Sequence, residues 1–332
     1  MTATMTQCLM QLVEEHHTLS DYQSDTLPRW CKGCGDNAIL TAMQRLCRDE
    51  NLAPEKTVCV SGIGCSSRLP HYMNAYGFHG VHGRALPVAE GIKLRRPDLN
   101  VFVTTGDGDC CSIGAAHWVH AIRYNMNMTV LLHDNQIYGL TKKQASPTSP
   151  KGLKSNTTPR GAYLDPLNPL TVTLGVANVS FVAQAADWIP DLLYDILRQA
   201  YRHHGLSFVR ILQRCPEFMD HNFDDFVHDP LKTRILVHGN GLRLKPEVSR
   251  IYRNQEVHDP LDMARALAIA SLEDEAPVGI LYRNPDVPCY EEIRQGERPN
   301  TPDLIRTVLD EEFDKVTIWP DAETGGTPEP AE

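Results

Sequence analysis

The stretch NVFVTTGDGDCCSIGAAHWVHAIRYNMNMTVLLHDN, residues 100–135, decides the fold class. It begins with an apolar run at 100–106 and ends with another at 128–134, and each run is typical of a buried strand. A helical pattern covers residues 112–124 between them. A strand, a helix and a strand within about 35 residues have the spacing of a crossover that joins two parallel strands. The stretch therefore predicts an α/β fold with a parallel sheet.

The same alternation of strands and helices continues on both sides of this stretch. Apolar positions recur at helical spacing from Asp36 to Asp49, and a further buried strand is expected at 57–63. Residues 179–213 repeat the order of strand, helix and strand. We therefore expect a doubly wound, mostly parallel sheet with a smaller C-terminal extension.

Composition divides the chain into four parts. We expect an N-terminal arm at 1–25, an α/β domain at 26–216, a C-terminal domain at 217–320 and a disordered tail at 321–332. Within the α/β domain, residues 141–161 are rich in Lys, Ser, Thr and Pro and are too long for an ordinary connection. Their position directly after a motif favours a lid.

Charge and hydropathy exclude several classes of function. The net charge is -10, from 42 acidic and 32 basic residues, and gives no support for nucleic-acid binding. No run reaches the ~18 apolar residues of a membrane span, and the first residues lack the features of a signal peptide. A cytoplasmic location is therefore expected, where the ten cysteines stay reduced or bind metal rather than form disulfides.

Oxygen ligands follow the two central strands. Asp107 comes after the first strand and Asn135 after the second, so both emerge at the same edge of the sheet. With the backbone carbonyl of Ile137 they form a set of hard oxygen donors suited to Mg²⁺. Gly106 and Gly108 let the backbone approach a diphosphate that shares the metal. A Gly-Asp-Gly alone is more often an ordinary turn, but the strands in front of both halves favour the metal site.

Four cysteines are placed to meet near this edge. Cys31 and Cys34 lie in the loop before the helix that begins at Asp36, while Cys65 and Cys215 follow predicted strands. Four thiolates suit either Zn²⁺ or a 4Fe-4S cluster. For an isolated Cys-x-x-Cys pair, zinc is the first interpretation and a redox dithiol is a third.

The metal motif resembles that of thiamine-diphosphate enzymes, in which Gly-Asp-Gly is followed after about 25 to 30 residues by Asn. Longer segments resemble one family closely, the β subunits of the 2-oxoacid:ferredoxin oxidoreductases, in particular the 2-oxoglutarate branch. These segments are LPRWCKGCGDNAIL at 27–40, SGIGCSSRLPHYMNAYGFHGVHGRALPVAEGIK at 61–93, HDNQIYGLTKKQASPTSPKG at 133–152 and RCPEF at 214–218.

This resemblance implies thiamine diphosphate, Mg²⁺ and one 4Fe-4S cluster. It implies that Cys31, Cys34, Cys65 and Cys215 hold the cluster and that Asp107, Asn135 and the Ile137 carbonyl hold the metal. It places Arg68, Leu140 and Lys142 on the substrate side. The residues implied to contact thiamine diphosphate are Ile63, Gly64, Cys65, Ser66, His82, Gly106, Asp107, Gly108, Asp109, Asn135, Tyr138, Gly139 and Leu140.

The chain departs from the family pattern at a few positions. Where Thr-Lys-Gly-Gln is common, this chain has Lys143 in place of the glycine, and Gly-Gly-Asn-His appears as Gly-Ala-Ala-His at 114–117. His79 and His82 stand in a glycine-rich loop and have no carboxylate partner, so we expect contacts with phosphate or backbone instead of a metal pair.

The implied activity is oxidative decarboxylation of a 2-oxoacid to acyl-coenzyme A, or the reverse carboxylation, with electrons passed through the cluster to a separate ferredoxin. The glutamate that activates thiamine diphosphate is expected on a separate α subunit, in a heterodimer or a dimer of heterodimers. Glu90 is the nearest candidate in this chain, and we expect it to begin a helix.

Two alternatives remain open at this point. In the first, the chain is part of a non-redox thiamine-diphosphate decarboxylase or synthase, with a structural zinc held by the four cysteines. In the second, it is a non-catalytic electron-transfer subunit that has the cluster but no working cofactor site. A cluster beside thiamine diphosphate has a task, because it collects the electrons released on decarboxylation, whereas zinc performs no redox chemistry.

Overall fold

The computed structural model describes residues 16–239, 242, 244–295 and 302–316. The chain divides into two compact units, of which the first ends at Glu291 and the second begins at Glu292. The described part of the second unit contains the end of α10 (Tyr290–Gln295) and α11 (Pro302–Val316). Among the described residues, we find no helix that combines the length and apolar character needed to cross a bilayer.

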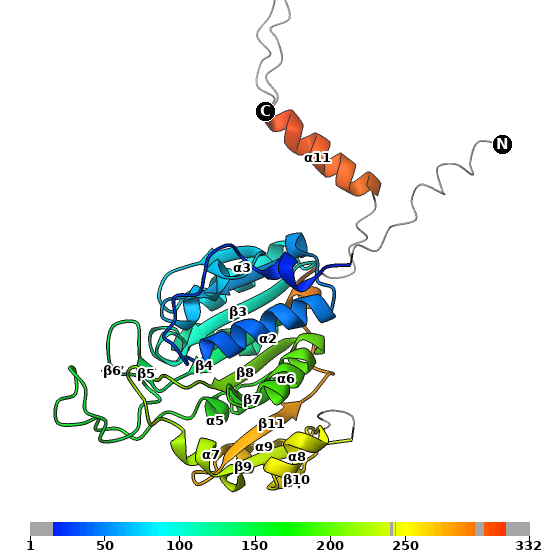
Figure 1. Cartoon of the computed structure of the whole chain (residues 1–332). Coiled ribbons are helices and arrows are strands. Elements are labelled where there is room, and N and C mark those ends of the chain that lie inside the picture. Colours follow the sequence, from blue (N-terminus) through cyan, green and yellow to red (C-terminus); the bar gives the residue numbers. More distant parts are fainter. Residues whose placement is uncertain (1–15, 240–241, 243, 296–301, 317–332) are drawn as a thin grey trace, which may run out of the picture. The chain divides into compact units, whose positions relative to one another are not determined.

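A single large sheet forms the centre of the first unit. In the part of the chain that the structure describes, nine strands follow the order β10-β9-β11-β7-β8-β4-β3-β1-β2 (Figure 1). The strands of this sheet are β1 (Thr57–Ser61), β2 (Tyr76–His79), β3 (Asn100–Gly106), β4 (Met128–Asp134), β7 (Phe181–Ala186), β8 (Leu206–Leu212), β9 (Thr233–Val237), β10 (Gln255–Val257) and β11 (Ala276–Arg283). A separate small hairpin pairs β5 (Ile137–Tyr138) with β6 (Gln144–Ala145).

The strands from β7 to β2 all pair in parallel, so their carboxyl ends meet at one edge. β11 pairs with β7 in the antiparallel direction and with β9 in parallel. In an open parallel sheet, ligands bind at the carboxyl edge near a switch in strand order. The fold therefore directs attention to the loops after β1, β3, β4 and β8.

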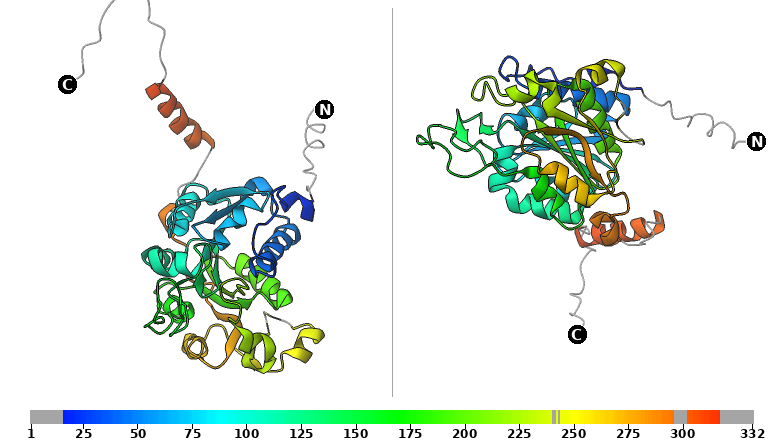
Figure 2. Two further views of the ribbon diagram at one scale, coloured as in Figure 1. Left: turned by 60° about the vertical axis from the view of Figure 1, so that its left-hand side comes forward. Right: turned by 90° about the horizontal axis from the view of Figure 1, so that it is seen from below.

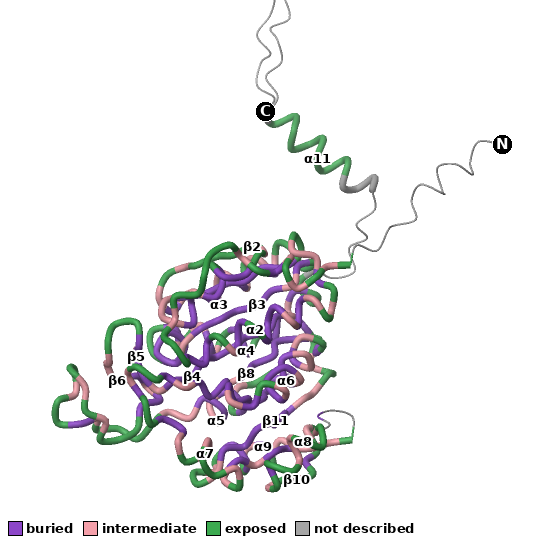
Figure 3. The backbone as a smooth tube through the Cα atoms, viewed as in Figure 1, coloured by how far each residue is buried: buried purple, intermediate pink, exposed green. Residues whose placement is uncertain are grey.

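Helices cover both faces of the sheet (Figure 2). Alternate strand residues face opposite layers: Phe102 packs with α2 (Asp36–Asp49) and α6 (Pro190–Arg202), whereas Val101 and Val103 pack with the helices of the other face. The helices of that second face are α3 (Ala85–Arg95), α4 (Ala115–Tyr124), α5 (Pro169–Leu174) and α9 (Met263–Ala270). Figure 3 shows the central strands as mostly buried between the two layers.

Short elements complete the described chain. The helices are α7 (Asp224–His228) and α8 (Pro246–Ile251), and the 3-10 turns are η1 (Leu19–Tyr22), η2 (Pro54–Lys56), η3 (Ser66–His71) and η5 (Pro230–Lys232). A π-helical turn, η4 (Asp109–Ile113), directly follows the Gly-Asp-Gly segment. Such turns are rare and occur often at functional sites.

The expected fold class is confirmed, because β3, α4 and β4 form the predicted parallel crossover. The predicted helix at 36–49 is α2. Two local expectations were wrong. The helix expected at 112–124 begins only at Ala115, because η4 occupies the preceding residues. Glu90 does not begin a helix but lies in the middle of α3.

The structure also differs from the domain boundary expected at residue 217. β9 and β10 extend the same sheet through β11, so residues up to Glu291 belong to one compact unit with the α/β core. The change of composition after Pro216 instead marks the part of the sheet that attaches in the antiparallel direction. The expected tail at 321–332 and most of the expected arm at 1–25 lie outside the described residues.

Candidate active site

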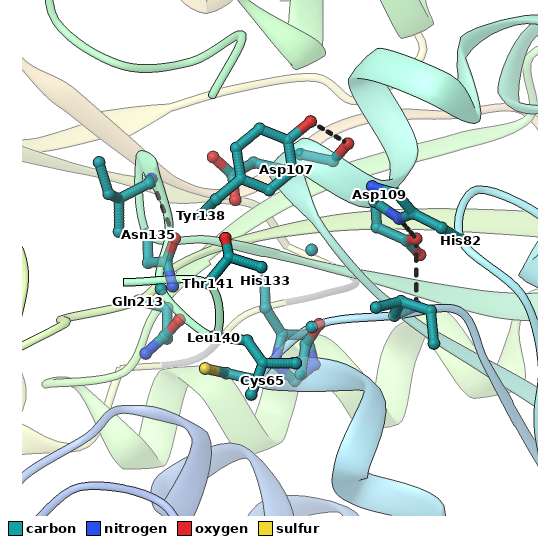
Figure 4. Close-up of a pocket in the computed structure, with 17 residues that line it drawn as sticks. Cys65, His82, Asp107, Asp109, His133, Asn135, Tyr138, Leu140, Thr141 and Gln213 are labelled. Carbon is teal, nitrogen blue, oxygen red and sulfur yellow. Dashed lines mark hydrogen bonds and ion pairs between the residues drawn. The ribbon is translucent and has the colours of Figure 1, made fainter. Parts of the chain in front are cut away.

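A cavity opens at the carboxyl edge of the parallel strands (Figure 4). Every residue predicted to contact thiamine diphosphate lines it, as does Ile137. The loop after β1 includes Gly64, whose backbone φ of +136° is accessible essentially to glycine alone. Three further residues line the cavity without having been predicted: His133, Thr141 and Gln213.

Asp109 holds two loops of this cavity together. Its Oδ1 atom accepts hydrogen bonds from the backbone N–H groups of Ile63, at 3.1 Å, and of Gly83, at 2.7 Å. The Nδ1 atom of His82 lies 2.5 Å from the same oxygen, and the Thr105 hydroxyl donates to Oδ2 at 2.7 Å. The carboxylate is 2% exposed, so it acts as an internal crosslink between the ends of three strands.

Asp107 is buried among hydroxyl donors. Its Oδ2 atom accepts hydrogen bonds from Ser146 and, at 2.7 Å, from Thr148. The Thr148 hydroxyl also lies 2.8 Å from Asp134. Burial, with a further contribution from the Asp134 carboxylate, raises the pKa of Asp107 to about 7. The segment 141–161, expected to be a lid, thus contributes two side chains that orient Asp107.

The charges around Asp107 do not balance within the chain. Asp134 pairs with Arg210 at 2.6 Å, and Arg210 also donates to Gln184 at 3.1 Å. This pairing leaves the Asp107 carboxylate without a cationic partner among the described residues, although only 2% of the residue is exposed. A buried carboxylate of this kind fits a bound cation.

The loop after β4 presents further oxygen atoms. The Asn135 side chain accepts from the backbone N–H of Ile137 at 3.1 Å, and the Asn135 carbonyl accepts from Asn222 at 3.1 Å. The Tyr138 hydroxyl donates to the Gly108 carbonyl at 2.9 Å, which ties this loop to the Gly-Asp-Gly turn. Asp107, Asn135 and Ile137 all line the cavity, and a carboxylate, an amide oxygen and a backbone carbonyl form a donor set that fits Mg²⁺.

The four predicted cluster cysteines lie near enough to one another for their charges to interact. Negative charge on Cys65 raises the pKa of Cys34, and negative charge on Cys31 raises the pKa of both Cys65 and Cys215. Burial is the largest cause in each case, and it raises the pKa of Cys65 to about 12. Such thiols ionise on binding a metal, because the positive charge of the metal offsets the free-energy cost of a buried thiolate.

The backbone around these thiols is arranged for bound thiolates. Hydrogen bonding from the backbone of residues 217–219 lowers the pKa of the Cys215 thiol, in opposition to burial, which raises it. The Met219 N–H also donates to the Cys215 carbonyl at 3.0 Å. Gly33, between the first two cysteines, adopts a φ of +82°. The indole N–H of Trp30 donates to the Cys65 carbonyl at 2.7 Å and so joins two of the cysteine loops. An all-sulfur set with these donors fits a metal centre with four cysteine ligands.

The residues predicted on the substrate side lie in different surroundings. Leu140 lines the cavity and is 40% exposed. Arg68 is half-buried in η3, where its positive charge partly offsets the rise that burial causes in the pKa of Cys65. Lys142 is exposed, and neither it nor Arg68 is among the described residues that line the cavity. Lys142 and Lys143 both adopt positive φ, of 69° and 72°. Lys143 thus has a backbone conformation that favours glycine, the residue common at this position in the family.

The expectation for His79 and His82 was partly wrong. His79 contacts the Ser67 carbonyl at 2.7 Å and the Ser61 hydroxyl at 3.0 Å, as expected for a backbone contact. His82, by contrast, has a carboxylate partner, which Asp109 supplies from another loop. Sequence distance concealed this pair, since 27 residues separate the two side chains.

The other missed residues carry only a weak sequence signal. His133 lies near the end of β4 and Gln213 directly after β8, where polar residues at strand ends are expected to face a ligand. Ser146 and Thr148 lie in the long loop, whose path to Asp107 the sequence does not specify.

Comparisons with known proteins identify the family. A family model for the C-terminal, cofactor-binding domain of thiamine pyrophosphate enzymes matches residues 62–211. A second, for the C-terminal part of the pyruvate ferredoxin oxidoreductase beta subunit, matches residues 248–297. The cavity residues from β1 to β8 fall within or directly beside the first match.

Named relatives agree with these family models. The chain is 39% identical over 285 residues to the beta subunit of 2-oxoacid:ferredoxin oxidoreductase 1 of Aeropyrum pernix, covering 85% of this chain and 86% of the relative. It is 47% identical over 216 residues to the 2-oxoglutarate oxidoreductase subunit KorB of Mycobacterium tuberculosis, covering 65% of this chain. That second match spans 58% of the length of the relative.

A solved structure shares the fold over almost the whole chain. The 2-oxoglutarate:ferredoxin oxidoreductase of Magnetococcus marinus superposes with a TM-score of 0.74 at 35% identity, covering 89% of this chain and 96% of the other. The family predicted from the cysteine and metal motifs is thereby confirmed. The chain belongs to the β subunits of the 2-oxoacid:ferredoxin oxidoreductases, in the 2-oxoglutarate branch.

Proposed function

We propose that this chain is the cofactor-binding and electron-collecting subunit of a 2-oxoglutarate:ferredoxin oxidoreductase. A 2-oxoacid and coenzyme A give acyl-coenzyme A, CO₂, one proton and two electrons, which reduce two ferredoxins, or the reaction runs in reverse. The observation that carries this proposal is the position of Cys65. It lines the cavity, and its charge interacts with those of the other three cysteines, so one residue belongs to both predicted cofactor sites.

The donor sets support three bound groups. Asp107, Asn135 and the Ile137 carbonyl would hold Mg²⁺, and the Gly-Asp-Gly turn would receive the diphosphate of thiamine diphosphate. Cys31, Cys34, Cys65 and Cys215 would hold one 4Fe-4S cluster. When bound, thiamine diphosphate supplies the chemistry of decarboxylation and the cluster accepts electrons one at a time.

The protein residues have separate tasks in this scheme. Asp109 fixes the loops of Ile63 and Gly83 against the cofactor. Thr148 and Ser146 orient Asp107 toward the cation. Cys65, as both a wall of the cavity and a cluster ligand, would give electrons a short route out of the cavity.

Two features support a second subunit over this site. The cavity has a volume of about 120 Å³, whereas complete sites for organic ligands usually reach about 300 to 1,000 Å³. The nearby edge strand β2 exposes Tyr76 and Phe78, which are 62% and 47% exposed, and Val81 beyond it is 69% exposed. We therefore infer that an α subunit covers this face and supplies the glutamate that activates thiamine diphosphate.

The substrate is inferred from relatives and from residues near the cavity. The Magnetococcus marinus enzyme was solved with 2-oxoglutarate, coenzyme A and succinyl-CoA bound, which supports 2-oxoglutarate as the substrate here. Arg68, Leu140 and Lys142 are proposed on the substrate side, where the two cationic side chains would meet the carboxylates and Leu140 the aliphatic part of the substrate.

The test is anaerobic purification of this chain with its α subunit, followed by measurement of iron, sulfide, zinc, magnesium and thiamine diphosphate. We expect four irons and four sulfides per chain, and reduction of ferredoxin that requires 2-oxoglutarate and coenzyme A. Cys215→Ser should lose iron, whereas Cys47→Ser, at a buried cysteine of α2, should keep it. One zinc per chain without iron would favour the non-redox alternative.

The Asp107→Ala variant distinguishes the proposed function from the second alternative, a non-catalytic electron-transfer subunit. If the chain were a non-catalytic electron-transfer subunit, this variant would keep the activity of the assembled complex. We expect it to keep the cluster and to lose both thiamine diphosphate and turnover.

A further inference from the structure

Gln213 connects the cavity with a proposed cluster ligand. The residue follows β8 and lines the cavity, and 1% of it is exposed. Its Nε2 atom donates to the Cys34 sulfur at 3.3 Å and to the Arg214 carbonyl at 2.8 Å. Figure 4 shows the Gln213 amide at the same end of the cavity as Cys65.

The geometry fixes this amide in place. An amide group has two N–H bonds, and both are used, one on the sulfur and one on the backbone. The backbone N–H of Gln213 donates to the Asp134 carbonyl at 3.0 Å, so the end of β8 is itself held. Because the side chain is buried, water does not compete for the bond to sulfur.

Asp36 places an opposing charge beside the Cys34 sulfur. An Asp36 carboxylate oxygen lies 3.5 Å from the sulfur, and His133, another cavity residue, holds the other Asp36 oxygen at 2.7 Å. A carboxylate beside a thiolate disfavours added negative charge. The backbone N–H of Asp36 and the side chain of Gln213 both act in the opposite direction, as donors to the sulfur.

Donors to cluster sulfurs alter the reduction potential. Reduction adds an electron to the cluster, part of whose charge resides on its sulfur ligands. An N–H donor stabilises the reduced state more than the oxidised state and therefore raises the potential. A side chain with this effect needs no contact with the iron.

We propose that Gln213 is a positioning residue that raises the reduction potential of the cluster through its hydrogen bond to Cys34, and so favours electron transfer out of the cavity. The proposal rests on the proposed function, because it requires the 4Fe-4S cluster. Gln213 is conveniently tested because methionine has similar length and lacks the donor, whereas glutamate has the same shape and adds a negative charge.

The experiment is a redox titration of the cluster, followed by electron paramagnetic resonance, on the anaerobically purified αβ complex. We expect a more negative midpoint potential in Gln213→Met and a larger negative shift in Gln213→Glu. The matched control is Gln44→Met, at a buried glutamine of α2 whose amide donates to the Tyr72 carbonyl instead of a cysteine. Its potential should equal that of the parent.

The outcomes separate this inference from the proposed function. A parent complex without iron would contradict the proposed function. A parent with a cluster whose potential stays unchanged, or becomes more positive, in Gln213→Met would overturn the inference alone. Loss of the cluster from both Gln213 variants would also overturn it, because the residue would then retain the cluster instead of setting its potential.

Discussion

His82 follows β2 and Asp109 begins η4, yet the Nδ1 atom of His82 lies 2.5 Å from the Asp109 carboxylate. The same carboxylate binds the backbone of the loop after β1. A residue directly after the Gly-Asp-Gly segment thus fixes both glycine-rich loops of the cavity. Its effect on the cofactor is expected to operate through these loops.

Asp109→Ala should destabilise the protein and weaken cofactor binding together. The change leaves the part-buried N–H of Ile63 and the buried N–H of Gly83 without an acceptor, and an unpaired buried donor costs about 1–3 kcal/mol. We expect a loss of about 3 kcal/mol in denaturant unfolding and weaker binding of thiamine diphosphate by calorimetry. Asp98→Asn, at an exposed ion pair, is the control and should change neither. Unchanged stability in Asp109→Ala would contradict the role of an internal crosslink.

Thr148→Val should raise the requirement for Mg²⁺. The variant keeps the volume of the side chain but removes the hydroxyl that donates to Asp107. Loss of a residue that orients a metal ligand typically lowers metal affinity by about 10- to 100-fold. The measurement is activity against Mg²⁺ concentration after chelation. Thr157→Val, at an exposed position of the same loop, should behave like the parent; an identical Mg²⁺ dependence in both variants would refute this role.

Lys143→Gly should stabilise the loop after β5. Lys143 has a φ of 72°, a conformation that glycine adopts without steric cost. We expect the relief of strain to add about 1 kcal/mol to the free energy of unfolding. The larger conformational entropy of glycine in the unfolded chain opposes this gain. Lys143→Ala keeps the strain and removes the side chain, so the comparison between the two variants isolates the backbone effect. Equal thermal midpoints would show that the positive φ carries no measurable cost.

Glu90→Gln should stabilise the protein at alkaline but not at acid pH. Burial raises the pKa of Glu90 from its ordinary 4.5 to about 7. Below about 4.5 both the folded and the unfolded states are protonated, so the two proteins should have equal stability. Between pH 4.5 and 7 the folded state binds more protons, and the stability of the parent falls as pH rises.

Above pH 7 the advantage of Glu90→Gln should be constant, at about 1–2 kcal/mol after allowance for the partial exposure of the group. Urea unfolding at about pH 4 and about pH 8 measures this difference in stability. Glu90 lies within α3 and is not among the described residues that line the cavity, so activity should be kept. Loss of turnover with unchanged stability would instead favour a direct catalytic role for this glutamate.

Local sequence patterns were sufficient for the central elements. The helix expected at 36–49 matches α2, and the strands expected at 100–106 and 128–134 match β3 and β4. Their apolar periods are local, and each element buries the face that its period indicates. The metal motif was also readable, because consecutive parallel strands bring their carboxyl ends to one edge.

Local sequence patterns did not predict that the C-terminal strands join the same sheet. A boundary at 217 was inferred from composition, but pairing between β11 and β7 places residues on both sides of it in one sheet. Composition reports how polar a segment is, whereas strand pairing depends on partners roughly a hundred residues away in the sequence.

The sequence by itself determined the residue types of the site: oxygen donors after β3 and β4, and four thiols in three loops. Only the tertiary structure decided which side chains support them. Thr148 meets Asp107, His82 meets Asp109 and Gln213 meets Cys34 across 41, 27 and 179 residues, respectively. A hydrogen bond requires its two groups to lie about 3 Å apart, and the distance between two residues in the sequence does not predict their distance in the fold. These partners can therefore be identified only from the tertiary structure.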